Sequence, residues 1–144
     1  MKQSAANKMA YRPIELTDMP FWLSMYADKD SQKQMYSAPI GNDQSFAEYI
    51  QKHHAFTVTF GERLIGGFTI SRIDERMATF GFILHPSVRG NGYGGIILDM
   101  IQRESRSMGI GVLRADVYED NYRSIGILES SGFRRFVWLE KNIQ

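Results

Sequence analysis

Hydrophobic and polar positions along the chain follow two periods, which predicts a mixture of helices and strands. Four segments carry apolar residues at helical spacing, and these helices are expected to begin near Asp18, Asn42, Gly94 and Arg123. Six segments are rich in β-branched and aromatic residues and are expected to be strands: 11–14, 55–60, 64–73, 77–84, 112–118 and 134–141. Gly66-Gly67 is expected to weaken the third of these strands. The order β-α-α-β-β-β-α-β-α-β indicates the α/β (α+β mixed) class, with antiparallel strands first and a βαβ unit late.

Polar residues mark the region before the second helix. The segment 28–41 is mostly polar and is expected to be a loop. Asn42 or Asp43 can cap the helix that follows, and Ser45 with Glu48 has the spacing of a capping box. The N-terminal residues 1–10 are also polar. The expected organisation is therefore a flexible leader over 1–10 and one domain over 11–144.

Composition and charge exclude several classes of function. The 17 basic and 16 acidic side chains nearly cancel, so the chain has no overall electrostatic attraction to nucleic acid or to an anionic membrane. The absence of cysteine removes disulfides, thiolate metal sites and a cysteine nucleophile. The three histidines match no metal-binding spacing, so no metal site is expected. No signal peptide and no membrane-spanning apolar run is recognisable, which predicts a cytoplasmic protein.

The segment Arg89-Gly90-Asn91-Gly92-Tyr93-Gly94, followed by Gly95, is the strongest candidate for a functional site. Closely spaced glycines let backbone N–H groups turn toward one point. The start of the next helix adds unpaired donors and the positive end of its dipole. A phosphate or pyrophosphate group fits such a cradle, and Arg89 adds a charge. A tight turn without a ligand is the alternative, but the strongly amphipathic helix that follows favours an anion site.

Two nucleotide-binding motifs explain the same glycines less well. Gly90-x-Gly92-x-x-Gly95, with Asp116 about twenty residues later, fits a dinucleotide fingerprint. That fold enters its first glycine directly from a strand, whereas here Pro86 and three further residues intervene. A P-loop is excluded because no Gly-Lys-Ser/Thr follows the glycines.

The chain resembles the GNAT superfamily of N-acetyltransferases at two motifs. The family's loop, Arg/Gln-x-x-Gly-x-Gly/Ala, is matched by Arg89-Gly90-Asn91-Gly92-Tyr93-Gly94, with Pro86 at the usual spacing before it. Downstream, Asn121-Tyr122-Arg123-Ser124-Ile125 followed by Ser131-Gly132-Phe133 is similar to the family's Asn-x-x-Ala/Ser-Ile and Gly-Phe pair. The order of elements also matches from Tyr11 onward, so the resemblance covers almost the whole chain.

The resemblance implies a fold and a cofactor. The implied fold has a central, mostly antiparallel sheet flanked by helices, whose fourth and fifth strands splay apart. The cofactor is acetyl-CoA or another acyl-CoA, with its pyrophosphate on the glycine loop and Asn121 beside it. Its pantetheine arm is expected to pair with backbone groups of Phe82, Ile83 and Leu84, because a splayed strand leaves N–H and C=O groups that need partners. One strand N–H can also polarise the thioester oxygen.

The implied reaction is direct attack of a primary amine on the thioester. An alkyl amine has a pKa of about 10.4, so a base must remove its proton. Asp116 is the candidate base, acting through water, although a solvated strand residue is an equally good interpretation of it. Many family members place a tyrosine, as proton donor to the leaving thiolate, where this chain has Leu128. Tyr122, Ser124 and water are the possible substitutes.

The acceptor and the oligomeric state are less defined by the sequence. The acceptor is expected to be a small-molecule amine or a peptide or protein amine. The family closes its sheet with two strands after Gly-Phe, whereas here only 134–141 remains. The last strand is therefore expected to be missing, shared with a partner subunit or replaced by the substrate. An exposed edge with Phe136 and Trp138 invites pairing and favours a homodimer. A non-catalytic acyl-CoA-binding or interaction module of the same fold is the alternative function.

Overall fold

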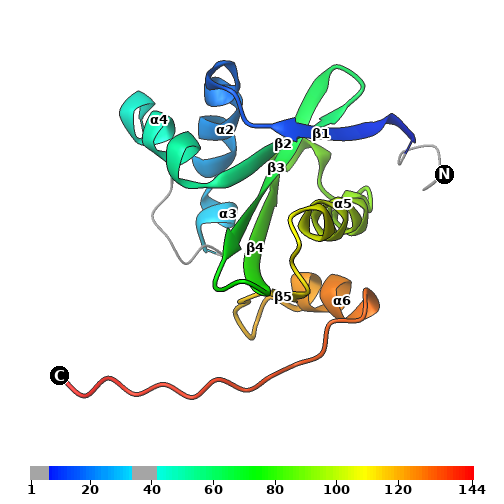
Figure 1. The fold of residues 1–144 in the computed structure, drawn as a ribbon. Coiled ribbons are helices and arrows are strands. Elements are labelled where there is room, and N and C mark those ends of the chain that lie inside the picture. Colours follow the sequence, from blue (N-terminus) through cyan, green and yellow to red (C-terminus); the bar gives the residue numbers. More distant parts are fainter. Residues whose placement is uncertain (1–6, 34–41) are drawn as a thin grey trace.

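A five-stranded mixed sheet forms the centre of the protein (Figure 1). The structure, a computed structural model, describes residues 7–33 and 42–144. The strands lie in chain order: β1 (Met9–Pro13), β2 (His54–Phe60), β3 (Arg63–Arg72), β4 (Met77–Leu84) and β5 (Val112–Arg114). The pairs β1–β2, β2–β3 and β3–β4 are antiparallel, and β5 is parallel to β4. The expected α/β class with a mostly antiparallel sheet is therefore confirmed.

Helices cover both faces of this sheet. The helices are α2 (Met19–Tyr26), α3 (Lys29–Lys33), α4 (Asp43–Lys52), α5 (Tyr93–Ser107) and α6 (Tyr122–Ser130), with short 3-10 turns η1 (Leu16–Asp18) and η2 (Pro86–Val88). In Figure 1, α2 and α4 lie on one side of the sheet and α5 on the other. Side chains of β4 alternate accordingly, so that Phe82 joins the core beneath α5 and Ile83 joins the core beneath α2 and α4.

The β4–β5 pair is short, and this shortness opens the sheet. Only Met77, Ala78 and Thr79 pair with β5, opposite Val112, Leu113 and Arg114. The second half of β4 continues beyond this pairing, while the chain after Arg114 leaves the sheet. The expected splay of the fourth and fifth strands is thus present. The expected strand 112–118 is wrong in length, because the chain beyond Arg114 has no strand partner among the described residues.

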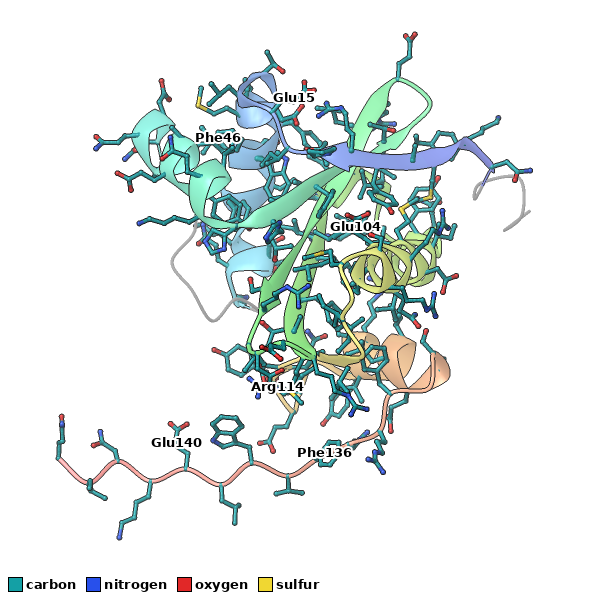
Figure 2. All side chains as sticks on the ribbon, viewed as in Figure 1. Glu15, Phe46, Glu104, Arg114, Phe136 and Glu140 are labelled. Atoms are coloured by element: carbon teal, nitrogen blue, oxygen red, sulfur yellow. The ribbon has the colours of Figure 1, made fainter. Side chains whose placement is uncertain are left out.

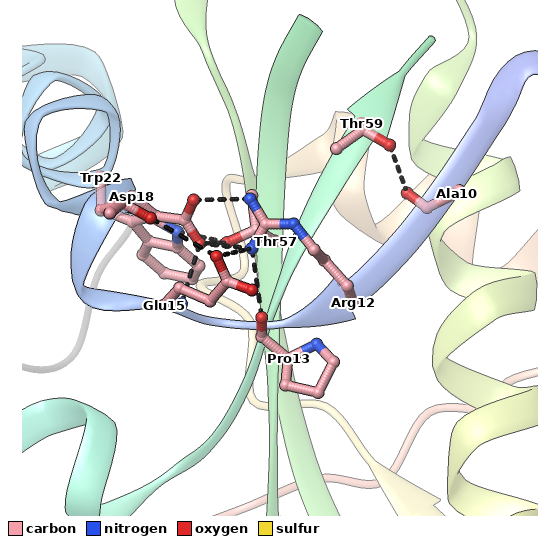
Figure 3. A network of polar contacts seen from close by, with 9 residues as sticks. Ala10, Arg12, Pro13, Glu15, Asp18, Trp22, Thr57 and Thr59 are labelled. Atoms are coloured by element: carbon pink, nitrogen blue, oxygen red, sulfur yellow. Dashed lines mark hydrogen bonds and ion pairs between the residues drawn. The ribbon is translucent and has the colours of Figure 1, made fainter. Parts of the chain in front are cut away.

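A buried polar network fastens the first strand to the sheet and to η1 (Figure 3). The Arg12 guanidinium donates to both carboxylate oxygens of Asp18, each at 2.7 Å. Asp18 also accepts from the backbone N–H of Glu15 at 2.9 Å and from the Thr57 hydroxyl at 2.8 Å. The indole N–H of Trp22 donates to Thr57 Oγ1 at 2.9 Å. Since Asp18, Thr57 and Trp22 are all buried, this network ties α2 to the sheet.

The region before α4 differs from the expected loop. Residues 29–33 form the short helix α3, which continues the path of α2, and residues 34–41 lie outside the described ranges. Asn42 caps α4, and it is one of the two residues, with Asp43, that were expected at this position. The capping box is formed by Asn42 and Ser45 rather than by Ser45 and Glu48: Asn42 Oδ1 accepts from the Ser45 N–H, and Ser45 Oγ accepts from the Asn42 N–H. Ser45 therefore stands at the third helical position and not at the cap.

The structure of the C-terminal segment differs most from what the sequence predicts. The expected strand 134–141 is wrong, since residues 133–144 contain no regular secondary structure. A strand requires a neighbour for its backbone hydrogen bonds, and none of the described strands lies beside this segment. Figure 2 shows Phe136 and Glu140 on a chain that runs away from the domain. Its large apolar side chains are exposed, among them Phe136, Val137, Trp138 and Leu139.

Candidate active site

A cleft of about 1120 Å³ lies between β4, the glycine loop and α6. Its floor and rim include most of the expected site residues: Phe82, Ile83, Leu84, Arg89, Gly90, Gly92, Tyr93, Gly94, Asn121, Tyr122 and Ser124. Asp30 also lines the cleft, and Ser31 and Arg123 join it without having been expected. Two motifs far apart in the sequence are thus brought to the same cavity.

The glycine loop turns its backbone through conformations that other residues avoid. Gly90 has φ 81° and Gly92 has φ 77°, both in the left-handed region. Gly92 is the N-cap of α5, and no side chain caps the helix at this end. The first N–H groups of α5 therefore keep their donor capacity at the rim of the cleft. Asn91 is not part of the lining, because its side-chain amide donates to the Val88 carbonyl at 2.8 Å and supports the loop from behind.

Two further contacts position the loop. A Cβ atom on Gly94 would lie 3.1 Å from Cδ1 of Ile127, so glycine allows α5 to approach α6 closely. The ring of Tyr93 packs against Phe60 with centroids 5.8 Å apart. The aromatic side chain of Tyr93 thus contributes to the core, and its backbone contributes to the loop. The start of α5 is fixed between the sheet and α6 by these contacts.

The second half of β4 presents to the cleft backbone groups that have no strand partner in the part of the chain that the structure describes. The bonds from the His85 N–H to the Ile65 carbonyl and from the Ile73 N–H to the Met77 carbonyl fix the phase of the β3–β4 ladder. In an antiparallel pair, alternate residues direct both backbone groups at the partner strand. Ile83 therefore directs its backbone groups toward β3. Phe82 and Leu84 direct theirs to the opposite side, where the β5 pairing has already ended. These amides have the spacing and direction of an open strand edge.

Arg89 lies at the other end of this edge and is held from three sides. Its guanidinium donates to Asp28 Oδ2 at 3.1 Å, to the Leu84 carbonyl at 3.2 Å and to the Ser31 hydroxyl. Asp28 also accepts from the backbone N–H and the hydroxyl of Ser31. These bonds from Ser31, followed by the contact with Arg89, lower the pKa of the Asp28 carboxyl. The charge of Arg89 is therefore partly neutralised by a carboxylate next to α3.

The downstream motif forms the opposite wall. Asn121 is the N-cap of α6, and its side chain accepts from the backbone N–H of Ser124 at 3.3 Å. Tyr122 is exposed at the rim, whereas Leu128 is buried in the domain. Arg123, in the first turn of α6, lies close to the loop, with one guanidinium nitrogen 3.9 Å from the Cβ position of Gly90. Sequence reasoning missed Arg123, although its place two residues after the helix cap, inside the second motif, was a usable signal.

The candidate base stands apart from the lining residues. Asp116 lies two residues beyond β5, and its side chain is 46% exposed. Its carboxylate is 3.6 Å from Nε of Arg114. Arg114 also lies over the ring of Trp138, 5.8 Å from the ring centroid. Asp116 is thus on the β5 side of the splay, close to the cleft in the chain but not among the residues that line it.

These features together define a class of ligand-binding domain. An open strand edge, a glycine loop without a side-chain cap and two nearby arginines suit an extended ligand that carries amides at one end and phosphates at the other. The arrangement is that of an acyl-CoA-binding domain of the α/β class. Residues 8–134 match the model of the acetyltransferase (GNAT) domain, and the chain belongs to this family. The expected enzyme class, acyl-CoA-dependent N-acetyltransferase, and the expected cofactor acetyl-CoA are confirmed by this membership.

Solved structures show the same fold at low sequence identity. A GNAT-family acetyltransferase from Bacillus anthracis is 18% identical with a TM-score of 0.79, over 94% of this chain and 86% of that chain. Spermidine N-acetyltransferase from Vibrio cholerae, in complex with CoA and spermine, is 18% identical with a TM-score of 0.80, over 88% and 80%. A Salmonella typhimurium protein with its cofactor acetyl-CoA is 17% identical with a TM-score of 0.74, over 87% and 79%. No curated protein sequence matches the chain.

Proposed function

We propose that this protein transfers an acetyl group from acetyl-CoA to a primary amine by direct attack of the amine on the thioester. The observation that carries the proposal is the shared cleft. The backbone edge of Phe82 and Leu84, which has no strand partner within the described ranges, and the donor-rich start of α5 line one continuous cavity of about 1120 Å³. The two parts suit the two halves of one ligand, amides on the strand and phosphates on the loop.

The residues present fit the cofactor. Backbone donors of the loop Arg89-Gly90-Asn91-Gly92-Tyr93-Gly94 and of the first turn of α5 are proposed to hold the pyrophosphate. The Phe82 and Leu84 amides are proposed to hold the pantetheine arm, while Ile83 contributes its side chain to the floor. When bound, acetyl-CoA supplies an activated acyl group with a thiolate leaving group. The acyl carbonyl needs a hydrogen-bond donor as negative charge develops on its oxygen, and a free strand N–H can act as one.

Proton removal from the amine is proposed for Asp116, acting through water. Its carboxylate is half-exposed, so water has access to it, and Nε of Arg114 lies 3.6 Å from it. Tyr122 and Ser124 at the start of α6 are the proposed sources of a proton for the leaving thiolate. Asp116→Asn should lower kcat far more than the affinity for CoA, and Glu119→Gln is the matched exposed-carboxylate control. An unchanged kcat in Asp116→Asn would remove this residue from the mechanism.

The acceptor is proposed to be a small cationic amine, with a peptide or protein amine as the second candidate. Spermidine N-acetyltransferase is among the proteins of similar fold, and one of its structures holds spermine. In this chain, Asp28 and Asp30 lie beside the cleft, and Asp30 is part of its lining. Carboxylates at this place attract a polyamine. A panel of spermidine, spermine, lysine and a peptide with a free N-terminus would rank these acceptors.

A non-catalytic acyl-CoA-binding module is the second candidate function. Buried Leu128 stands where many family members have a tyrosine, and Asp116 is not part of the cleft lining. A thiol-release assay with acetyl-CoA and the amine panel separates the two functions. Turnover of any amine supports the enzyme. Calorimetric binding of CoA with no turnover of any amine supports the module, and no binding of CoA contradicts both.

A homodimer is proposed as the functional assembly. The C-terminal segment exposes Phe136 and Trp138, which is costly for an isolated chain in water. A second copy could cover these side chains in a symmetric exchange. Spermidine N-acetyltransferase from Vibrio cholerae, whose fold is similar, has a dodecameric structure.

A further inference from the structure

The guanidinium of Arg89 connects the cofactor loop with the helix on the acceptor side. It donates to Asp28 and Ser31, which precede it in the chain by 61 and 58 positions, and to the carbonyl of Leu84. Ser31 belongs to α3, and Asp28 is the residue just before this helix. Three parts of the site, namely α3, the end of β4 and the glycine loop, therefore meet at one side chain.

We propose that Asp28 competes with the cofactor's diphosphate for Arg89, so that cofactor binding releases the Asp28 carboxylate to bind the cationic amine. Asp28 is thereby a positioning residue for the cofactor and a specificity residue for the acceptor. The inference rests on the proposed function, and it adds an exchange of partners at Arg89 when the cofactor binds.

The positive charge of Arg89, which the diphosphate would bind, is already paired with Asp28. A guanidinium has five N–H donors and one positive charge. In this structure the charge lies 3.1 Å from a carboxylate that is only 23% exposed. A diphosphate carries more negative charge than one carboxylate and offers several acceptors for a fork of donors. Arg89 therefore gains by moving from Asp28 to the diphosphate, and the pair with Asp28 must be broken or weakened for this to happen.

The Leu84 carbonyl is a second group that Arg89 and the cofactor would both bind. The ladder phase of β4 directs the backbone groups of Phe82 and Leu84 into the cleft, where the pantetheine amides are proposed to pair. Arg89 already donates to the Leu84 carbonyl at 3.2 Å. The same side chain thus occupies a strand acceptor that the cofactor needs. Movement of Arg89 toward the loop would free that acceptor at the moment when the cofactor arrives.

After its release from Arg89, the Asp28 carboxylate would still be held by Ser31. Two of its hydrogen bonds come from Ser31, at 2.9 Å from the backbone N–H and 3.0 Å from the hydroxyl, and neither is donated by Arg89. These bonds keep the carboxylate in place and ionised when the guanidinium leaves. Asp30 on the same helix lines the cleft. The release of Asp28 therefore creates a pair of carboxylates beside the cofactor, which suits an acceptor with positive charge.

The test is a double-mutant cycle on CoA affinity. Isothermal calorimetry would give the Kd of CoA for the full chain and for Asp28→Asn, Arg89→Gln and the double variant. Asp28→Asn should tighten CoA binding by about two- to fivefold, the effect of freeing one partly exposed ion pair. The same substitution should change the Kd by less than about 1.5-fold in the Arg89→Gln background, where no guanidinium is left to be released.

Asp30→Asn is the matched control, because it removes the same charge two residues further along the chain, in α3. Asp30 pairs with Lys33 at 3.8 Å and not with Arg89, so its effect on CoA affinity should be clearly smaller than that of Asp28→Asn. A shift of equal size would show that only the general field of the cleft matters. If Asp28→Asn fails to fold, Asp28→Ser removes the same charge while keeping an oxygen acceptor for the Ser31 N–H, and it should shift the Kd in the same direction.

The acceptor side gives a second readout. In Asp28→Asn, the KM for the amine that the wild type acetylates should rise several-fold while kcat changes by less than about twofold. Weaker CoA binding in Asp28→Asn, or an equal shift in both backgrounds, would overturn the inference. Absence of CoA binding to the wild type would instead contradict the proposed function itself, so the two failures are distinguishable.

Discussion

Gly67 of β3 lies against the indole of Trp22 so closely that no larger residue fits. A Cβ atom on Gly67 would lie 2.3 Å from Cζ2 of Trp22 and 3.1 Å from the Phe56 carbonyl oxygen. Trp22 is fully buried, and its N–H is engaged by Thr57. The glycine that was expected to weaken the strand is therefore what lets α2 pack directly on the sheet.

Gly67→Ala should destabilise the protein by about 1–3 kcal/mol, because the indole or the strand must shift to admit a methyl group. Gly81→Ala on the neighbouring strand is the matched control. A Cβ there would lie 3.8 Å from Thr69 Oγ1, an ordinary contact, so the melting temperature should stay the same or rise. Urea denaturation of both variants measures the difference. Equal stability of the two variants would mean that the indole is not confined as the structure shows.

Asp18→Asn tests the buried network that holds β1 to α2. Burial alone would raise the pKa of Asp18, but the hydrogen bonds from Arg12, Glu15 and Thr57 outweigh it, and the pKa is lowered. A lowered folded-state pKa means that the carboxylate stabilises the fold above the unfolded-state pKa of about 3.9 and loses this effect as the pH falls through the folded value.

The expected cost of Asp18→Asn at pH 7 is about 2–3 kcal/mol, because Arg12 and Thr57 lose a charged partner. The difference from the wild type should shrink when denaturation is repeated near pH 3. Asp99→Asn, at an exposed position on α5, should change the free energy of unfolding by less than about 0.5 kcal/mol. A cost that does not vary with pH would show that the charge of Asp18 contributes nothing.

Local patterns predicted the parts of the fold whose formation is itself local. The strands β2 to β4 and the helix α5 are close to their expected ranges, because alternating or helical apolar spacing reports the buried face directly. The segment 134–141 has the composition of a strand, but composition cannot supply the neighbour that a strand needs. The helix α3 (Lys29–Lys33) is polar, so its sequence has no apolar periodicity that could have predicted it.

The candidate site likewise has parts that the sequence could predict and parts that it could not. The glycine loop follows from residues that are close in sequence, whereas the edge at Phe82 and Leu84 was expected from the family resemblance. The partner of Arg89 was not predictable, because Asp28 lies 61 positions away and reaches the loop only through the packing of α2 and α3. Arg123 enters the cleft for a similar reason, since the contact of α6 with the loop depends on the close approach at Gly94.

The exposed C-terminal segment makes a prediction about assembly. Gel filtration at micromolar concentration should give a dimer for the wild type. The double substitution Phe136→Asp and Trp138→Asp should convert it to a monomer, because two carboxylates cannot be buried in a strand exchange without partners. Glu140→Gln, on the same segment, should leave the elution volume unchanged. A wild type that elutes as a monomer would remove the proposed homodimer.

Substitution of two glycines at opposite ends of α5 distinguishes the effect of backbone strain on stability from an effect on ligand binding. Gly92 precedes the helix with φ 77°, and Gly109 follows it with φ 77°. Neither has an atom within 4 Å of its Cβ position, so alanine meets the same left-handed strain and no clash at either place. Each substitution should cost about 1–2 kcal/mol of stability. The helix between them is roughly 22 Å long, which keeps Gly109 far from the cleft.

Only Gly92→Ala should affect the cofactor. Relaxation of the strained backbone there would turn the first N–H groups of α5 away from their common point, and the Kd for CoA should rise at least about tenfold, as expected when one or two charge-assisted hydrogen bonds are lost. Gly109→Ala should bind CoA like the wild type at a similarly reduced melting temperature. Calorimetry on both variants, below their melting range, makes the comparison. If both bound CoA equally well, the loop at the start of α5 would not be the diphosphate site, since its geometry would have been altered without consequence for the ligand.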